Sequence, residues 1–103
     1  MNADKKILVG EDSSVIINLT KNVLAFENYQ MTAARNGQQV LDLLAKEDFD
    51  LILMDISMPI LDGIACTKAI RELADEKKSK LPIIAISGNI HNMTHDDFRK
   101  AGF

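Results

Sequence analysis

Short, continuously apolar runs constrain the fold of this chain more than any other feature. They span residues 7–9, 51–54 and 82–86, and each is three to five residues long. Runs of this length without polar alternation are typical of strands buried on both faces of a parallel sheet. Residues 30–34 form a more polar segment, which we expect at an edge of the same sheet.

Between these runs, apolar residues recur at steps of three and four, as on one face of an amphipathic helix. They are Ile16, Leu19, Val23 and Phe26 after the run 7–9, Val40, Leu41 and Leu44 after the segment 30–34, and Cys66, Ile70 and Leu73 after the run 51–54. The alternating order βαβαβαβα predicts a parallel sheet with helices on both faces and right-handed crossovers.

Polar residues mark where these helices should begin and end. Ser13 or Ser14 can cap the first helix, Asp62 the third, and Thr94 the fourth, which Gly102 could end. The third helix is expected to run from residue 64 to residue 75. Three lysines, at positions 77, 78 and 80, would then complement its dipole in solvent.

The composition fits one soluble domain. The chain has 103 residues, of which 47% are hydrophobic and 26% charged, enough for one core. A net charge of -3 argues against a nucleic-acid or anionic-membrane surface. No signal peptide or bilayer-spanning run is evident, so we expect a cytoplasmic protein. Its single cysteine, Cys66, fits that location and is expected to be a small buried hydrophobe.

Carboxylate and hydroxyl residues follow three of the predicted strands. Glu11 and Asp12 follow the first strand, Asp55 the third and Ser87 the fourth. A doubly wound sheet binds ligands beyond the carboxyl ends of its strands, where the strand order reverses. Carboxylates gathered there repel one another unless a proton or a cation neutralises them. Mg²⁺ suits such oxygen ligands and usually also binds a phosphate, so Asp55 could serve as a nucleophile that forms an aspartyl phosphate.

Each of these residues also has an ordinary structural interpretation. Asp55 alone could cap a turn, Glu11 and Asp12 could favour a helix amino terminus, and Ser87 is a common loop residue. Their joint placement at strand ends favours a phosphoryl site. A dinucleotide or flavin phosphate fits less well, because residues 10–14 place two negative charges where it would lie. A haloacid-dehalogenase-like phosphatase needs a second aspartate where this chain has Ser57.

The chain resembles the receiver domains of two-component response regulators, above all those associated with hybrid histidine kinases. The matching segments are ILVGEDS at 7–13, DLILMDISMPILDG at 50–63 and LPIIAISGN at 81–89, with support from RNGQQVLDLL at 35–44. The resemblance implies a flavodoxin-like α/β fold, a doubly wound parallel sheet with strand order 2-1-3-4.

The resemblance also implies a role for each site residue. Asp55 would accept a phosphoryl group from the phosphohistidine of a histidine kinase or a histidine phosphotransfer domain. Asp12 would bind Mg²⁺ directly, Glu11 would bind it through water, Asp55 would be a further ligand, and Ser57 would contribute its backbone carbonyl. Ser87 would close on the phosphoryl group and so change a partner-binding face. Such a domain is a phosphoacceptor that assists its own phosphorylation and dephosphorylation, and not an enzyme.

The sequence departs from the family at its carboxyl end. A complete receiver would continue into a fifth strand and helix with an active-site lysine, so residues 1–103 are expected to be a C-terminally incomplete receiver. The fourth strand would then be an exposed edge through which the chain could form a homodimer. Two alternatives remain open: a receiver-like interaction module that does not switch, and a small Mg²⁺-dependent phosphatase.

Overall fold

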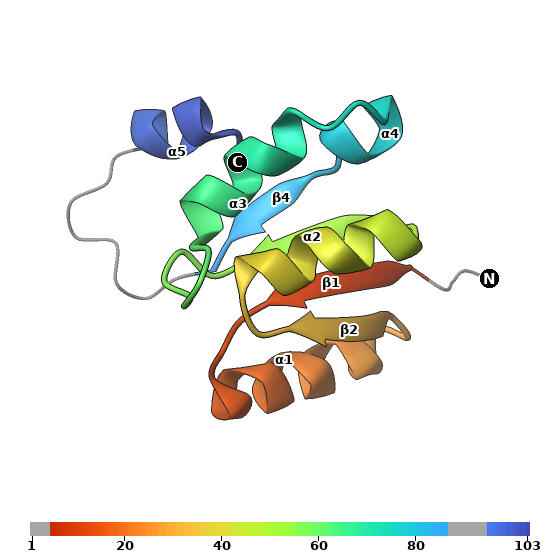
Figure 1. Ribbon diagram of the computed structural model, residues 1–103. Helices are drawn as coiled ribbons and strands as arrows, with labels where there is room; N and C mark the ends of the chain where they lie inside the picture. The colour runs from red at the N-terminus through yellow and green to blue at the C-terminus, as the bar shows by residue number, and fades with distance from the viewer. Residues whose placement is uncertain (1–4, 87–94) are drawn as a thin grey trace.

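The computed structural model describes residues 5–86 and 95–103, which form a parallel sheet with helices packed against it (Figure 1). The strand order is β2-β1-β3-β4, as predicted. The strands are β1 (Lys6–Gly10), β2 (Gln30–Ala34), β3 (Leu51–Met54) and β4 (Ile83–Ala85). The helices are α1 (Ser14–Phe26), α2 (Gly37–Lys46), α3 (Gly63–Arg71), α4 (Glu76–Ser79) and α5 (His95–Ala101).

The central strand β1 fixes where the other strands end. It pairs in parallel with β2 on one side and β3 on the other, and Gly10 lies opposite both Ala34 and Met54. All three strands therefore end at one edge of the sheet. The residues that follow β1 and β3 must emerge side by side.

Alternate side chains of each strand point to opposite faces of the sheet. Leu8, Ile52 and Met54 are fully buried in the main core, together with Val40 of α2 and Ile70 of α3. Figure 1 accordingly shows α2 lying over β1. The neighbours of Leu8 in β1 are also buried but lie outside this core, so they face the opposite layer.

Helix α1 forms where the sequence predicted it, but its apolar periodicity does not mark its buried face. Its one buried residue is Ile17. The exposed fractions of Leu19, Val23 and Phe26 are 60%, 65% and 90%, and Ile16 is 41% exposed. The apolar spacing thus predicted a helix correctly, while α1 turns much of that apolar surface away from the sheet.

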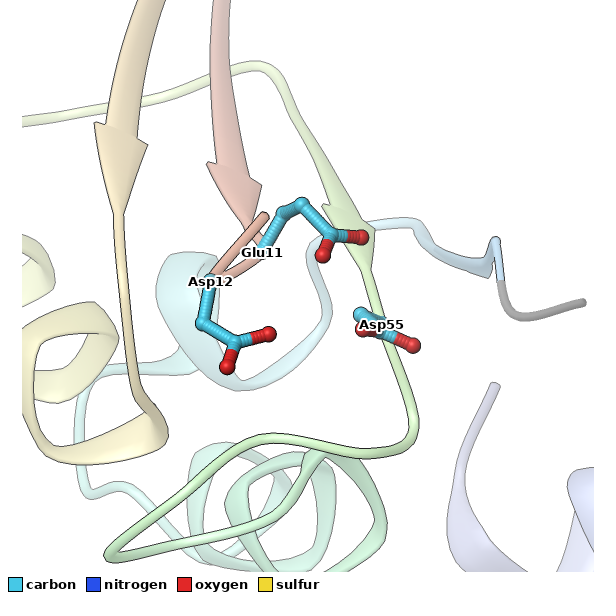
Figure 2. Close-up of side chains that lie close together, drawn as sticks. All are labelled: Glu11, Asp12 and Asp55. Carbon is cyan, nitrogen blue, oxygen red and sulfur yellow. The ribbon is translucent and has the colours of Figure 1, made fainter. Parts of the chain in front are cut away.

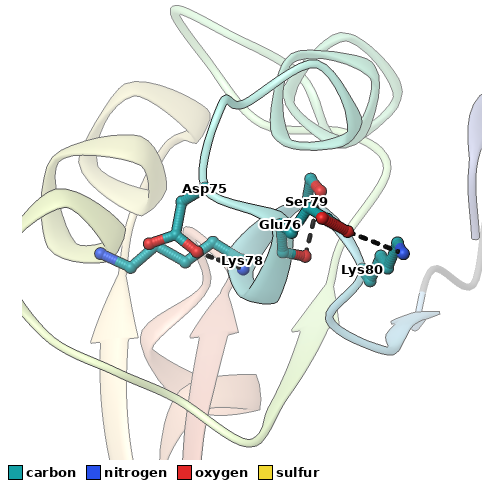
Figure 3. A network of polar contacts seen from close by, with 5 residues as sticks. All are labelled: Asp75, Glu76, Lys78, Ser79 and Lys80. Atoms are coloured by element: carbon teal, nitrogen blue, oxygen red, sulfur yellow. Dashed lines mark hydrogen bonds and ion pairs between the residues drawn. The ribbon is translucent and has the colours of Figure 1, made fainter.

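The expected helix from residue 64 to residue 75 is wrong at its carboxyl end. Helix α3 stops at Arg71, and Asp75 begins the separate short helix α4 by accepting a hydrogen bond from the backbone N–H of Lys78 (3.2 Å; Figure 3). The lysines therefore do not cap α3. Lys78 is half-buried and its Nζ donates to the carbonyl of Leu44, while Lys80 forms an exposed ion pair with Glu76 at 3.2 Å.

Arg71 ties the end of α3 to three other segments. Its Nε donates to the carbonyl of Gly102 (2.8 Å), just after α5, and its guanidinium also donates to the carbonyls of Ser79 (2.9 Å) and Leu81 (2.6 Å). Gly102 ends α5 with a φ of 109°, a conformation that suits glycine. None of the helices in the described ranges has the combination of length and apolarity needed to cross a bilayer.

Candidate functional site

The carboxylates of Glu11, Asp12 and Asp55 face one common space beyond the ends of β1 and β3 (Figure 2). One oxygen from each residue lies within 4.8 Å of the other two. The backbone brings them together, because the N–H of Asp55 donates to the carbonyl of Gly10 (2.8 Å) and so extends the β1–β3 pairing by one residue. The structure thus gathers the three acidic residues that the sequence predicted to meet.

Glu11 is the most buried member of this acidic cluster, with 2% of its surface exposed. Its Oε2 accepts a hydrogen bond from the N–H of Ser13 (3.0 Å), but its Oε1 is buried and has no partner among the described residues. Burial raises the pKa of Glu11, and the nearby Asp55 and Asp12 raise it further, against the opposing hydrogen bond from Ser13. An ionised Glu11 therefore needs a cation.

The other two carboxylates differ in exposure. Asp55 is 9% exposed, and its Oδ1 accepts a hydrogen bond from the N–H of Ser57 (3.2 Å). Asp12 is exposed at the tip of the loop after β1. Three carboxylate oxygens at this spacing offer a hard divalent cation a partial set of ligands, which water and a phosphoryl oxygen usually complete around Mg²⁺.

The loop after Asp55 is held by close backbone packing. The N–H of Gly63 donates to the carbonyl of Ile56 (2.9 Å), and a Cβ at Gly63 would lie 2.0 Å from the carbonyl oxygen of Asp55. Asp62 caps α3 by accepting from the N–H of Ala65 (2.8 Å), as predicted. The start of α3 is therefore pressed against the residue that carries the buried carboxylate.

The same loop contains a strained residue. Ile60 has a φ of 71°, a left-handed conformation that a β-branched residue rarely adopts, and its side chain is 81% exposed. Strain of this kind persists only where the surroundings enforce it, and it is often found at functional sites. Here it presents a large apolar side chain a few residues beyond Asp55.

The structure brings the three carboxylates together, but the roles of all the predicted site residues stay predictions. Ser87 lies outside the described residues. Ser57 lies two residues after Asp55 and its N–H donates a hydrogen bond to that carboxylate, but its role as a carbonyl ligand rests on the resemblance alone.

One residue at this edge was missed by the sequence reasoning. Arg35 follows β2 and donates to the carbonyl of Asp12 (3.1 Å) and to Oγ of Ser14 (2.8 Å). The signal that could have identified Arg35 is its position directly after β2. The site residues Glu11, Asp12, Asp55 and Ser87 were selected because they follow the other three predicted strands.

Comparison with known proteins agrees with this geometry. Residues 7–103 match the response regulator receiver domain family. The chain is 35% identical over 103 residues to hybrid signal transduction histidine kinase I of Dictyostelium discoideum, a match that covers 95% of this chain and 6% of that protein. It spans only 4% to 8% of the length of the first three such kinases that it matches.

Solved structures give the same result. The receiver domain of sensor histidine kinase PA1611 from Pseudomonas aeruginosa PAO1, with a magnesium ion coordinated in its active site cleft, is 32% identical with a TM-score of 0.85, covering 98% of this chain and 81% of that one. Response regulator TrrA from Thermotoga maritima, in complex with Mg(2+)-BeF, is 33% identical with a TM-score of 0.75. The match covers 84% of this chain and 72% of that one. The chain therefore belongs to the response regulator receiver domain family of two-component signalling.

Proposed function

We propose that this domain accepts a phosphoryl group on Asp55 in a Mg²⁺-dependent reaction. The observation that carries the proposal is the buried Oε1 of Glu11, which has no partner among the described residues and lies in a cluster with the carboxylates of Asp12 and Asp55. A divalent cation would neutralise the cluster, and a water bound to it would satisfy this oxygen. The magnesium ion in the PA1611 receiver supports the choice of metal.

In the proposed reaction, an oxygen of the Asp55 carboxylate attacks the phosphorus of a phosphohistidine. The new O–P bond forms as the P–N bond breaks, and the imidazole nitrogen keeps the bonding electron pair. The hydrogen bond from Ser57 to Oδ1 orients the carboxylate and leaves the other oxygen for attack. Mg²⁺, held by Asp12 directly and by Glu11 through water, with a further ligand from the Ser57 carbonyl, would offset the charge of the phosphoryl oxygens. Ser87 is proposed to close on the phosphoryl group afterwards.

The proposed donor is a histidine kinase or a histidine phosphotransfer domain, in the cytoplasm. The hybrid kinases among the relatives support this class of partner. Exposed apolar side chains follow two of the clustered carboxylates along the chain and offer a surface for such a partner. Val15 and Ile16 follow Asp12 with 68% and 41% exposure, and Ile60 follows Asp55 with 81% exposure. A partner docked there would bring its phosphohistidine over the carboxylates.

Receiver domains generally act as phosphoacceptors and not as catalysts, and we propose the same for this chain. A receiver is modified about once per molecule, whereas a phosphatase would release phosphate from small phosphoesters with repeated turnover. Incubation with p-nitrophenyl phosphate and Mg²⁺ distinguishes the two. Sustained release of nitrophenol that Asp55→Asn abolishes would favour the phosphatase alternative.

We also propose that a second copy of the chain can pair along β4. Among the described strands β4 pairs with β3 alone, and Ile84 is 50% exposed on it. A strand from a second copy would extend the sheet at this edge. Sedimentation velocity over a concentration series should show a dimer that Ile84→Lys weakens. A chain that stays monomeric at all concentrations would exclude this pairing.

The phosphoacceptor proposal is tested by intact mass spectrometry after incubation with Mg²⁺ and phosphoramidate. We expect one phosphoryl adduct that disappears with EDTA and in Asp55→Asn. Asp42→Asn is the matched control, because it removes an exposed aspartate on α2 and should leave the adduct intact. A folded chain that forms no adduct would refute switching by this chain alone and favour the interaction-module alternative.

A further inference from the structure

The guanidinium of Arg35 joins the loop after β1 to the loop after β2. One terminal nitrogen donates to the carbonyl of Asp12 (3.1 Å) and the other to Oγ of Ser14 (2.8 Å). Arg35 is itself held at the start of α2, because its backbone N–H donates to Oε1 of Gln39 (2.7 Å). The side chain thus reaches from an anchored backbone to both sides of Ser13, the residue that caps α1.

Asp12 is otherwise weakly restrained. The residue before it continues the β1–β2 pairing, since the N–H of Glu11 donates to the carbonyl of Ala34 (2.9 Å), and the residue after it caps α1 by accepting from the N–H of Ile16 (3.4 Å). Asp12 lies exposed between these two fixed points. Arg35 supplies the hydrogen bond that holds its carbonyl.

We propose that Arg35 is a positioning residue for Mg²⁺ binding, which it supports by fixing the backbone of Asp12. The inference rests on the proposed function, in which Asp12 is a direct ligand. Residues that orient metal ligands typically contribute 10–100-fold to metal affinity. Because the two hydrogen bonds of Arg35 are exposed to solvent, we expect the lower end, about a tenfold rise in the dissociation constant for Mg²⁺ when they are lost.

The sign of the effect separates positioning from simple electrostatics. The guanidinium binds a carbonyl and a hydroxyl, and it forms no ion pair within the part of the chain that the structure describes. A positive charge near a cation site repels the cation, so charge removal alone should strengthen Mg²⁺ binding. Loss of positioning should weaken it.

The experiment is a Mg²⁺ titration of the full chain, followed by the NMR shifts of its backbone amides. Arg35→Gln should weaken binding about tenfold with little change in thermal stability. Arg35→Lys keeps the charge but cannot bridge two acceptors in the same way, so it should restore only part of the affinity. Arg99→Gln is the matched control, because it removes an exposed arginine of α5 and should leave binding unchanged.

Ser14→Ala completes a double-mutant cycle without any change of charge. It removes one of the two acceptors, so it should weaken binding less than Arg35→Gln does, and it should add nothing further in the Arg35→Gln background. Equal or tighter binding in Arg35→Gln would overturn the positioning role alone. No Mg²⁺-dependent shift in the unaltered chain would overturn the proposed metal site and this role with it.

Discussion

Replacement of Gly63 by alanine tests how closely the start of α3 is packed against the candidate site. The new Cβ would lie 2.0 Å from the carbonyl oxygen of Asp55, 2.9 Å from its carbonyl carbon and 3.0 Å from Cα of Ile56. Ordinary contacts begin near 3.4 Å, so the two backbone segments would have to separate by about 1.4 Å, the difference between 3.4 and 2.0 Å. All three of these nearest atoms belong to the backbone, so the shift cannot be absorbed by the far end of a flexible side chain.

This clash should lower the free energy of unfolding by more than the higher helix propensity of alanine raises it. Overpacking in a filled site costs ~1–3 kcal/mol, and here backbone must move, which places the cost at or above the upper end. Alanine recovers at most ~1 kcal/mol of helix propensity. We therefore expect Gly63→Ala to lower the free energy of unfolding by about 2–3 kcal/mol and the Tm by roughly 10–20 °C.

Urea denaturation followed by circular dichroism measures this loss, with Gly10→Ala as the control. A Cβ at Gly10 would meet the side chains of Met54 at 3.0 Å and Val40 at 3.1 Å. Because side chains can adjust more easily than backbone, Gly10→Ala should lower the free energy of unfolding by less than Gly63→Ala does. Folded Gly63→Ala should also bind Mg²⁺ weakly, because site geometry tolerates only about 0.5 Å of displacement. Stability within about 0.5 kcal/mol of the unaltered chain, or a larger loss in Gly10→Ala, would refute the reasoning.

Three further predictions follow from other buried groups. Burial raises the folded-state pKa of Glu11 above its usual value near 4.5, so its favourable contribution is present below that value and is lost as pH rises through the folded-state pKa. In EDTA, Glu11→Gln should therefore melt higher than the unaltered chain at pH 8 and the gap should close toward pH 4; a gap independent of pH would contradict this. Burial raises the pKa of the Cys66 thiol to about 12, so alkylation at pH 8 should be far slower in the folded chain than in urea, and equal rates would contradict its burial. Arg71→Gln removes charged hydrogen bonds to three backbone carbonyls and should lower the free energy of unfolding by about 2 kcal/mol, with faster amide exchange in α5; unchanged exchange there would show that Arg71 does not anchor that helix.

The sheet could be predicted because its strands are buried on both faces. An apolar run without alternation, such as residues 51–54, leaves few structures other than an interior strand. The strand order came from the resemblance and not from periodicity. The meeting of Glu11 and Asp55 then followed from the geometry of parallel strands that end at one edge.

The buried faces of the helices could not be predicted in the same way. Apolar spacing shows that Leu19 and Val23 share one side of a helix, but it does not show which side meets the sheet, and in α1 that side is exposed. The end of α3 depended on contacts distant in sequence. Arg71 donates hydrogen bonds to the carbonyls of Ser79, at the end of α4, and Leu81, just before β4. These bonds hold the chain in a turn after Arg71, where the local sequence pattern alone would have allowed the helix to continue.

The site shows why a stable fold and a functional site make opposing demands on one residue. Ionised Glu11 destabilises the metal-free fold, because two other carboxylates lie beside it and one of its buried oxygens finds no partner among residues 5–86 and 95–103, which costs free energy. A glutamine there would relieve the repulsion, yet it would remove the charge that attracts a divalent cation. The sequence keeps the glutamate directly after the buried β1, where the strand pairing fixes its backbone. The rigid sheet thus holds the destabilising group in place, and the looser Asp12 needs a restraint from outside the sheet, which Arg35 is placed to give.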